Sequence, residues 1–143
     1  MTEENRKRLT ELGVKIVGKT SSPFEGLEFS LARYGFTPAT WAVLETLEAV
    51  GGYGLKTAVE AAIMATDAGE VPPFQEAIAV GGTAEPAGGA DAAIVMGSTF
   101  SSTAFSKDPK KRFAVYEIIA MPRHKKWYKE IGTGEGFLVQ ETF

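Results

Sequence analysis

Cysteine is absent from this sequence of 143 residues, and histidine occurs only once, at position 124. The lack of cysteine excludes disulfides, thiolate nucleophiles, cysteine-ligated zinc and iron–sulfur clusters. The lone His124 has no His, Cys or carboxylate neighbour at metal-ligand spacing, and no Ser-His-Asp arrangement can be recognised around it. The sequence therefore predicts no metal site and identifies no catalytic residue.

Long apolar runs are also missing. No stretch of about 18 apolar residues is available to cross a bilayer. The opening segment, MTEENRKRLTELG, is polar and lacks the apolar centre of a secretory signal. We therefore expect a cytoplasmic protein without a membrane partner.

The chain has no excess of positive charge, because 15 Lys and Arg residues face 18 Asp and Glu residues. This balance disfavours nucleic acid as a partner. Two local segments, KDPKKR (107–112) and PRHKKWYK (122–129), concentrate basic groups. Interleaved aromatic residues would suit phosphates or single strands, but a solvated face is the commoner outcome of such segments.

Length and composition indicate one domain. A chain of 143 residues with 44% hydrophobic residues can build one core but not two. We expect this core within about residues 14–123, followed by a tail at 124–143. The apolar residues of the tail predict that it docks on its own domain or on a neighbouring subunit.

The helices are expected early in the chain. The charged segment 3–12 ends at Gly13, and Thr37 with Pro38 forms a good start for a helix that Gly51 and Gly52 close. A further helix is predicted over 55–68, since one broad face collects apolar and small residues. Its members are Leu55, Ala58, Val59, Ala62, Ile63 and Thr66.

Four strands are expected. A short strand is predicted at 14–18 (VKIVG), and three apolar runs follow at 76–82 (EAIAVGG), 91–97 (DAAIVMG) and 113–123 (FAVYEIIAMPR). Helices early and strands late indicate an α/β three-layer sandwich. We predict a mostly parallel sheet with one antiparallel edge strand.

Four of these segments, in this order, carry a family resemblance. They read GLKTAVEAAIMATDAG, EAIAVGGT, GADAAIVM and YEIIAMPR. Together they resemble the pyruvate kinase alpha/beta domain-containing proteins, stand-alone relatives of the C-terminal domain of pyruvate kinase, over about residues 14–123. The resemblance implies that domain's fold and a bound small ligand, flavin mononucleotide (FMN) or another phosphorylated molecule. It does not imply kinase activity, because phosphoryl transfer takes place in a barrel domain that this chain does not have.

The chain departs from the family pattern in two places. Family members carry a further βα unit with a serine-rich loop at the N-terminus, so this chain resembles a shortened relative or one completed by another chain. The turn after VGGT is lengthened by AEPAG. An uncovered sheet edge at the shortened end would favour a homo-oligomer or a partner chain.

The glycine-rich connection between the strands at 76–82 and 91–97 is the first candidate site. Glycines allow backbone N–H groups to approach a phosphate, so Gly81, Gly82 and Thr83 form a candidate anion cradle. Asp91 would accept a hydrogen bond from the ligand. The alternative is a glycine-rich turn between neighbouring strands, with Asp91 as its cap.

Hydroxyl-rich loops could complete this pocket. Thr20, Ser21 and Ser22 follow the predicted strand at 14–18, and Ser98 and Thr99 follow the strand at 91–97. Each set reads equally as an ordinary surface loop. Arg123, directly after the last strand, is the most plausible single cation for a phosphate.

A pair of carboxylates on one predicted helix gives a further possibility. Glu60 and Asp67 are seven residues apart and therefore share a face. An acid/base pair is conceivable, but Lys56 lies one turn before Glu60, and a surface ion pair is the commoner outcome. The hypothesis is thus a domain that binds a small phosphorylated or flavin ligand. The alternative is a non-catalytic structural or regulatory subunit completed by a partner chain.

Overall fold

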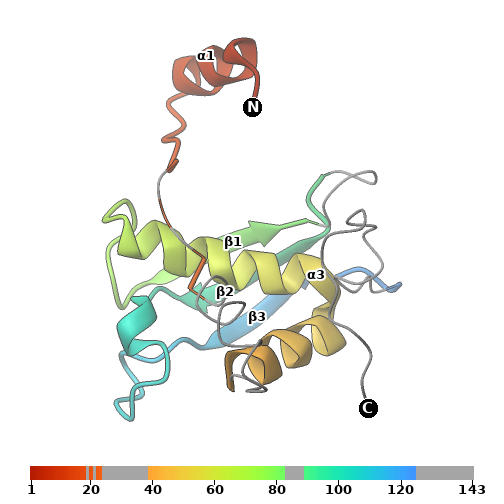
Figure 1. The fold of residues 1–143 in the computed structure, drawn as a ribbon, viewed down its shortest axis with the longest axis vertical. Coiled ribbons are helices and arrows are strands. Elements are labelled where there is room, and N and C mark those ends of the chain that lie inside the picture. The colour runs from red at the N-terminus through yellow and green to blue at the C-terminus, as the bar shows by residue number, and fades with distance from the viewer. Residues whose placement is uncertain (19, 21, 24–38, 83–88, 125–143) are drawn as a thin grey trace, which may run out of the picture.

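The computed structural model describes residues 1–18, 20, 22–23, 39–82 and 89–124. In these residues a long helix lies across one face of a three-stranded sheet, and a short N-terminal helix projects away from both (Figure 1). The chain is therefore an α/β protein, as expected. The described residues form two layers, and the three-layer sandwich is not established.

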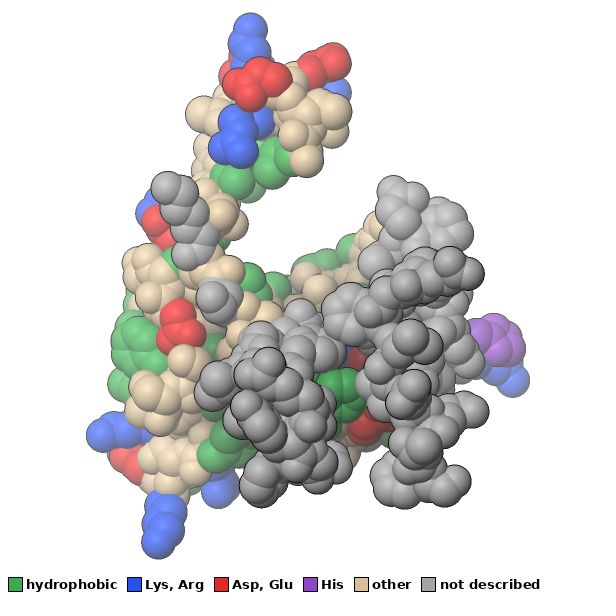
Figure 2. Space-filling model, in the orientation of Figure 1, with side chains coloured by type: hydrophobic (Ala, Val, Ile, Leu, Met, Phe, Trp, Pro, Cys, Tyr) green, Lys and Arg blue, Asp and Glu red, His purple; other side chains and the backbone are tan. Residues whose placement is uncertain are grey.

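Helix α1 (Glu3–Glu11) begins at Thr2, whose side chain accepts a hydrogen bond from the Asn5 backbone N–H at 3.2 Å. It ends before Gly13, which has a φ of 76°. None of its residues is buried. Figure 2 shows its charged side chains gathered at the top of the view, apart from the body of the molecule.

Helix α3 (Ala39–Asp67) consists of two helical segments that meet at Gly52, where φ is 73° and ψ is −178°. Glycine is favoured here because a side chain would be strained at this φ. The predicted break at Gly51 and Gly52 is thus confirmed as a kink, while the predicted start at Thr37 and Pro38 lies outside the described residues. No helix in the described part of the chain is long and apolar enough to cross a membrane.

Strands β1 (Glu76–Gly81), β2 (Ala92–Gly97) and β3 (Val115–Ala120) lie in the order β1-β2-β3, with every pair antiparallel. All three strands were expected at these positions. The prediction of a mostly parallel sheet is wrong for these strands. The residues between β1 and β2 join adjacent strands, which is possible only for an antiparallel pair, whereas parallel neighbours need a longer crossover.

The predicted strand at 14–18 is also wrong. Residues 14–18 form no ladder, and Val14 and Val17 are exposed. Lys15, Val17 and Thr20 instead line a pocket with residues of α3. A strand needs a neighbouring edge for its backbone groups, and this segment meets a helix rather than the sheet.

The core lies between α3 and the sheet. The predicted apolar face of α3 is confirmed, because all six of its members are buried: Leu55, Ala58, Val59, Ala62, Ile63 and Thr66. Ala79, Ile94 and Met96 complete the core from β1 and β2. Small residues bring α3 close to the sheet, and a Cβ at Gly81 would collide with the Gly54 carbonyl oxygen and the Ala58 backbone.

Candidate functional site

The strongest polar cluster of the described residues is an ion pair on α3. Lys56 Nζ lies 2.7 Å from Glu60 Oε2, and their side chains are only 3% and 8% exposed. An ion pair between these two residues was expected, because they are one helical turn apart, and it was expected at the surface. The expectation of a surface location is wrong, since both side chains are buried.

Further contacts hold this ion pair in place. Ser22 Oγ donates a hydrogen bond to Glu60 Oε1 at 2.6 Å, so the carboxylate accepts from Lys56 and Ser22 on its two oxygens. Lys56 Nζ also lies 4.8 Å from the centre of the Tyr53 ring, within the range of a cation–π contact. The pairing and the hydrogen bond offset part of the cost of removing these two charges from water.

A pocket of about 420 Å³ adjoins the ion pair. It lies between the second segment of α3 and three residues of the preceding chain, Lys15, Val17 and Thr20. Its lining residues are Lys15, Val17, Thr20, Thr57, Glu60, Ala61, Met64 and Ala65. The volume falls within the range of small-molecule sites.

The N-terminal wall of the pocket is tethered to the chain beyond α3. Lys15 Nζ lies 2.8 Å from Glu70 Oε2, and both side chains are accessible to solvent. The hydrogen bond with Glu70, together with its negative charge, raises the pKa of Lys15 above the ordinary 10.5. Lys15 is therefore a charged ammonium paired with a carboxylate at neutral pH.

In the glycine-rich connection between β1 and β2, the backbone of one side lies close to the backbone of the other. Asp91 N–H donates to the Gly81 carbonyl at 3.0 Å, which closes the β1–β2 hairpin. A Cβ at Gly82 would collide with the carbonyl oxygen of Gly89, so the two arms of the connection run close together. Close packing explains both Gly81 and Gly82 structurally. Thr83 lies outside the described residues, and whether this connection binds an anion stays a prediction.

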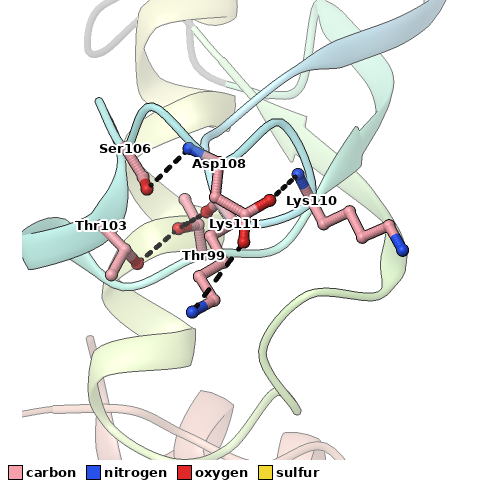
Figure 3. A network of polar contacts seen from close by, with 6 residues as sticks. All are labelled: Thr99, Thr103, Ser106, Asp108, Lys110 and Lys111. Carbon is pink, nitrogen blue, oxygen red and sulfur yellow. Dashed lines mark hydrogen bonds and ion pairs between the residues drawn. The ribbon is translucent and has the colours of Figure 1, made fainter.

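Ser98 and Thr99 have structural partners. Ser98 Oγ donates to the Pro72 carbonyl at 2.7 Å and accepts from Gln75 N–H at 3.1 Å. Thr99 Oγ1 donates to the Lys111 carbonyl at 2.5 Å and lies 2.9 Å from Thr103 Oγ1. Asp108, which accepts from Lys110 N–H, belongs to the same loop (Figure 3). These bonds fold residues 98–112 back on themselves, and Ser98 and Thr99 are fully buried.

The structure does not bring the predicted site residues into one place. Gly81 and Asp91 lie at one end of β2, and Ser98 and Thr99 follow its other end. Arg123 follows β3 at the same end of the sheet as Gly81, and it is exposed. Because the strands are antiparallel, their carboxyl ends alternate between opposite ends of the sheet, so Ser98 and Thr99 do not meet Gly81 and Asp91.

The predicted hydroxyl residues at 20–22 lie away from both ends of the sheet where they are described, beside α3. Thr20 lines the pocket beside α3 and Ser22 contacts Glu60, whereas Ser21 lies outside the described residues. The two carboxylates of α3 have different partners: Glu60 pairs with Lys56, and Asp67 Oδ1 accepts a hydrogen bond from Ser101 N–H at 3.0 Å. Sequence reasoning did not identify the pocket residues Lys15, Thr57 and Met64, which occupy unremarkable positions in the sequence.

No family model matches this chain. The resemblance to the pyruvate kinase alpha/beta domain-containing proteins therefore remains a prediction from the four sequence segments.

Proposed function

We propose that this chain is a small-ligand-binding α/β domain and that the pocket beside α3 is its binding site. One observation carries the proposal, namely a pocket of about 420 Å³ next to a buried, paired Lys56 and Glu60. Buried charged groups beside a concave, mostly apolar surface are typical of ligand sites. The proposal retains Thr20 from the predicted site residues.

The family resemblance suggests which ligand to try first. It implies FMN or another small phosphorylated molecule. A flavin would bring a flat ring that Met64 and Val17 could contact, and hydroxyl groups for Thr20. The proposal is limited to binding and includes no reaction.

Pocket filling tests the proposal. Replacing Ala65 by Phe adds a ring to the pocket wall, and Ala49→Phe adds the same ring at an exposed position of α3 away from the pocket. We expect FMN, followed by quenching of its fluorescence, to bind the natural chain and Ala49→Phe, and to bind Ala65→Phe at least about tenfold more weakly. Equal binding to all three proteins would reject the pocket as the site.

A second candidate function has its own supporting observation. All six residues of β3 are exposed, with Tyr116 at 58% and Ile119 at 51%. An edge strand with exposed apolar side chains is suited to pair with another chain. We propose a homo-oligomer or partner-completed subunit as the alternative, which sedimentation of the purified chain over a range of concentrations would test.

A further inference from the structure

Apolar side chains form two opposite walls of the pocket beside α3. Val17 forms one wall, and Ala61, Met64 and Ala65 form the opposite wall along the last turns of α3. These side chains offer contact area without hydrogen-bonding groups. They would favour a flat or compact apolar portion of a ligand.

The charges around the pocket cancel. Lys15 and Glu60 are the ionisable residues of the lining, and each has an opposite charge within 2.8 Å, namely Glu70 for Lys15 and Lys56 for Glu60. Two positive and two negative groups leave no net charge among these four residues. A phosphate is normally held by cations or by N–H groups at a helix N-terminus. The pocket instead lies along residues 57–65, within the second segment of α3, and none of its described lining residues is at a helix N-terminus.

Thr57 introduces an unsatisfied hydrogen-bonding group. Its Oγ1 is buried and has no hydrogen-bond partner, although the residue lines the pocket and is partly exposed. The exposed part of the side chain is therefore not the hydroxyl. For a ligand to reach this hydroxyl, the side chain has to rotate about χ1, and a helical threonine has two accessible χ1 rotamers. An uncharged ligand group would then satisfy a hydroxyl whose isolation is otherwise unfavourable.

We infer that the pocket receives the uncharged end of its ligand, a ring or polyol that exchanges a hydrogen bond with Thr57, and not a phosphate group. This inference rests on the proposed function, because it specifies the ligand class of the same pocket. A phosphate on the ligand would remain outside the pocket, toward solvent. The ligand class is thus defined by an apolar body with an N–H, O–H or carbonyl group.

Two flavins that differ only in a phosphate test this inference. Riboflavin and FMN are titrated into the full-length chain, with flavin fluorescence and the NMR signal of the Met64 methyl group as readouts. We expect riboflavin to bind within about threefold of FMN, and about 10 mM inorganic phosphate not to displace either. Thr57→Val should weaken both flavins by up to about tenfold, while Thr46→Val, at an exposed threonine of the same helix, should not.

The other outcomes separate this inference from the proposed function. If FMN binds at least tenfold more tightly than riboflavin and inorganic phosphate displaces it, the phosphate occupies the site. That result overturns the inference and leaves the pocket as a ligand site. If neither flavin is quenched at about 100 µM and the Met64 signal does not move, the proposed flavin function and the inference both fail. Equal flavin binding by Thr57→Val and the natural chain would reject the role of Thr57.

Discussion

The second half of α3 and strand β3 are both rich in apolar residues, yet their surroundings are opposite. Ile63 of α3 is fully buried, whereas Ile119 of β3 is 51% exposed. The helix lies against β1 and β2, and its other side faces Lys15, Val17, Thr20 and Ser22. The strand is at the edge of the described sheet, whereas α3 packs mainly on β1 and β2. Position in the sheet, rather than apolar composition, decides which of the two is covered.

The largest expected effect comes from breaking the buried charge pair on the covered helix. Lys56→Met leaves Glu60 buried without its cation, which should lower the free energy of unfolding by about 3–5 kcal/mol. Urea denaturation followed by circular dichroism measures the loss. The double variant Lys56→Met with Glu60→Leu removes both charges and should recover most of the stability. A loss for the double variant as large as for the single one would contradict this account.

Truncation of one isoleucine in each region tests the comparison directly. Ile63→Ala should cost about 2–5 kcal/mol, because it leaves a cavity in the core. Ile119→Ala removes a side chain that is already half in water and should change the stability of the monomer by about 0.5 kcal/mol or less. Urea denaturation of both variants at low protein concentration measures the two losses of stability. Equal losses would mean that β3 is covered in solution.

A methyl group at the contact between α3 and the sheet should have an intermediate effect. Gly81→Ala places a Cβ against Gly54 and Ala58, and we expect a loss of about 1–3 kcal/mol. Gly18→Ala is the matched control, since nothing lies within 4 Å of its added Cβ. Thermal unfolding of both variants should show a lower midpoint for Gly81→Ala only. An unchanged midpoint would show that the helix can move away from the sheet at little cost.

A charge on the uncovered strand tests whether another copy covers it. Ile119→Lys should leave the stability of the monomer within about 0.5 kcal/mol but abolish any oligomer that buries β3. Val50→Lys places the same charge at an exposed site on α3 as a control. Sedimentation equilibrium gives the association state of each. An oligomer that persists in Ile119→Lys would locate the interface elsewhere.

The smallest effect is expected at the exposed tether of the pocket wall. Lys15 has a raised pKa because of Glu70, so the favourable contribution of this pair is fully present at neutral pH. It should be lost only as the pH rises above 10.5 and through the raised pKa of Lys15. Unfolding midpoints of the natural chain and Lys15→Gln should therefore differ little and should converge at high pH. If the difference between the two midpoints instead increased as the pH rose above 10.5, the account of the Lys15–Glu70 pair would be contradicted.

Local elements were predictable because their signals lie within a few residues. The glycine at position 13 ends α1, the glycines at 51 and 52 break α3, and the periodicity of residues 55–66 marks the buried face. The three apolar runs became strands for the same reason. The strand expected at 14–18 failed because its pattern is short and no sheet edge lies beside it.

The candidate site was much less predictable. Thr20 was identified from its hydroxyl and does line the pocket, but Thr57 and Met64 look like ordinary helix residues. The glycine connection drew attention by its composition, yet contacts with Gly54, Ala58 and Gly89 explain Gly81 and Gly82. The spacing of Lys56 and Glu60 predicts an ion pair, but not that it is buried.

Local sequence patterns were sufficient to predict where α3 breaks, which face of its second segment is apolar and where β1, β2 and β3 run. These features depend on backbone preferences and short periodicities, which act between neighbouring residues. The antiparallel pairing of the described strands, the burial of Lys56 and Glu60 and the exposure of β3 follow instead from the packing of the whole fold. Each of these depends on which distant segments meet, and burial is set by those neighbours rather than by the residue itself.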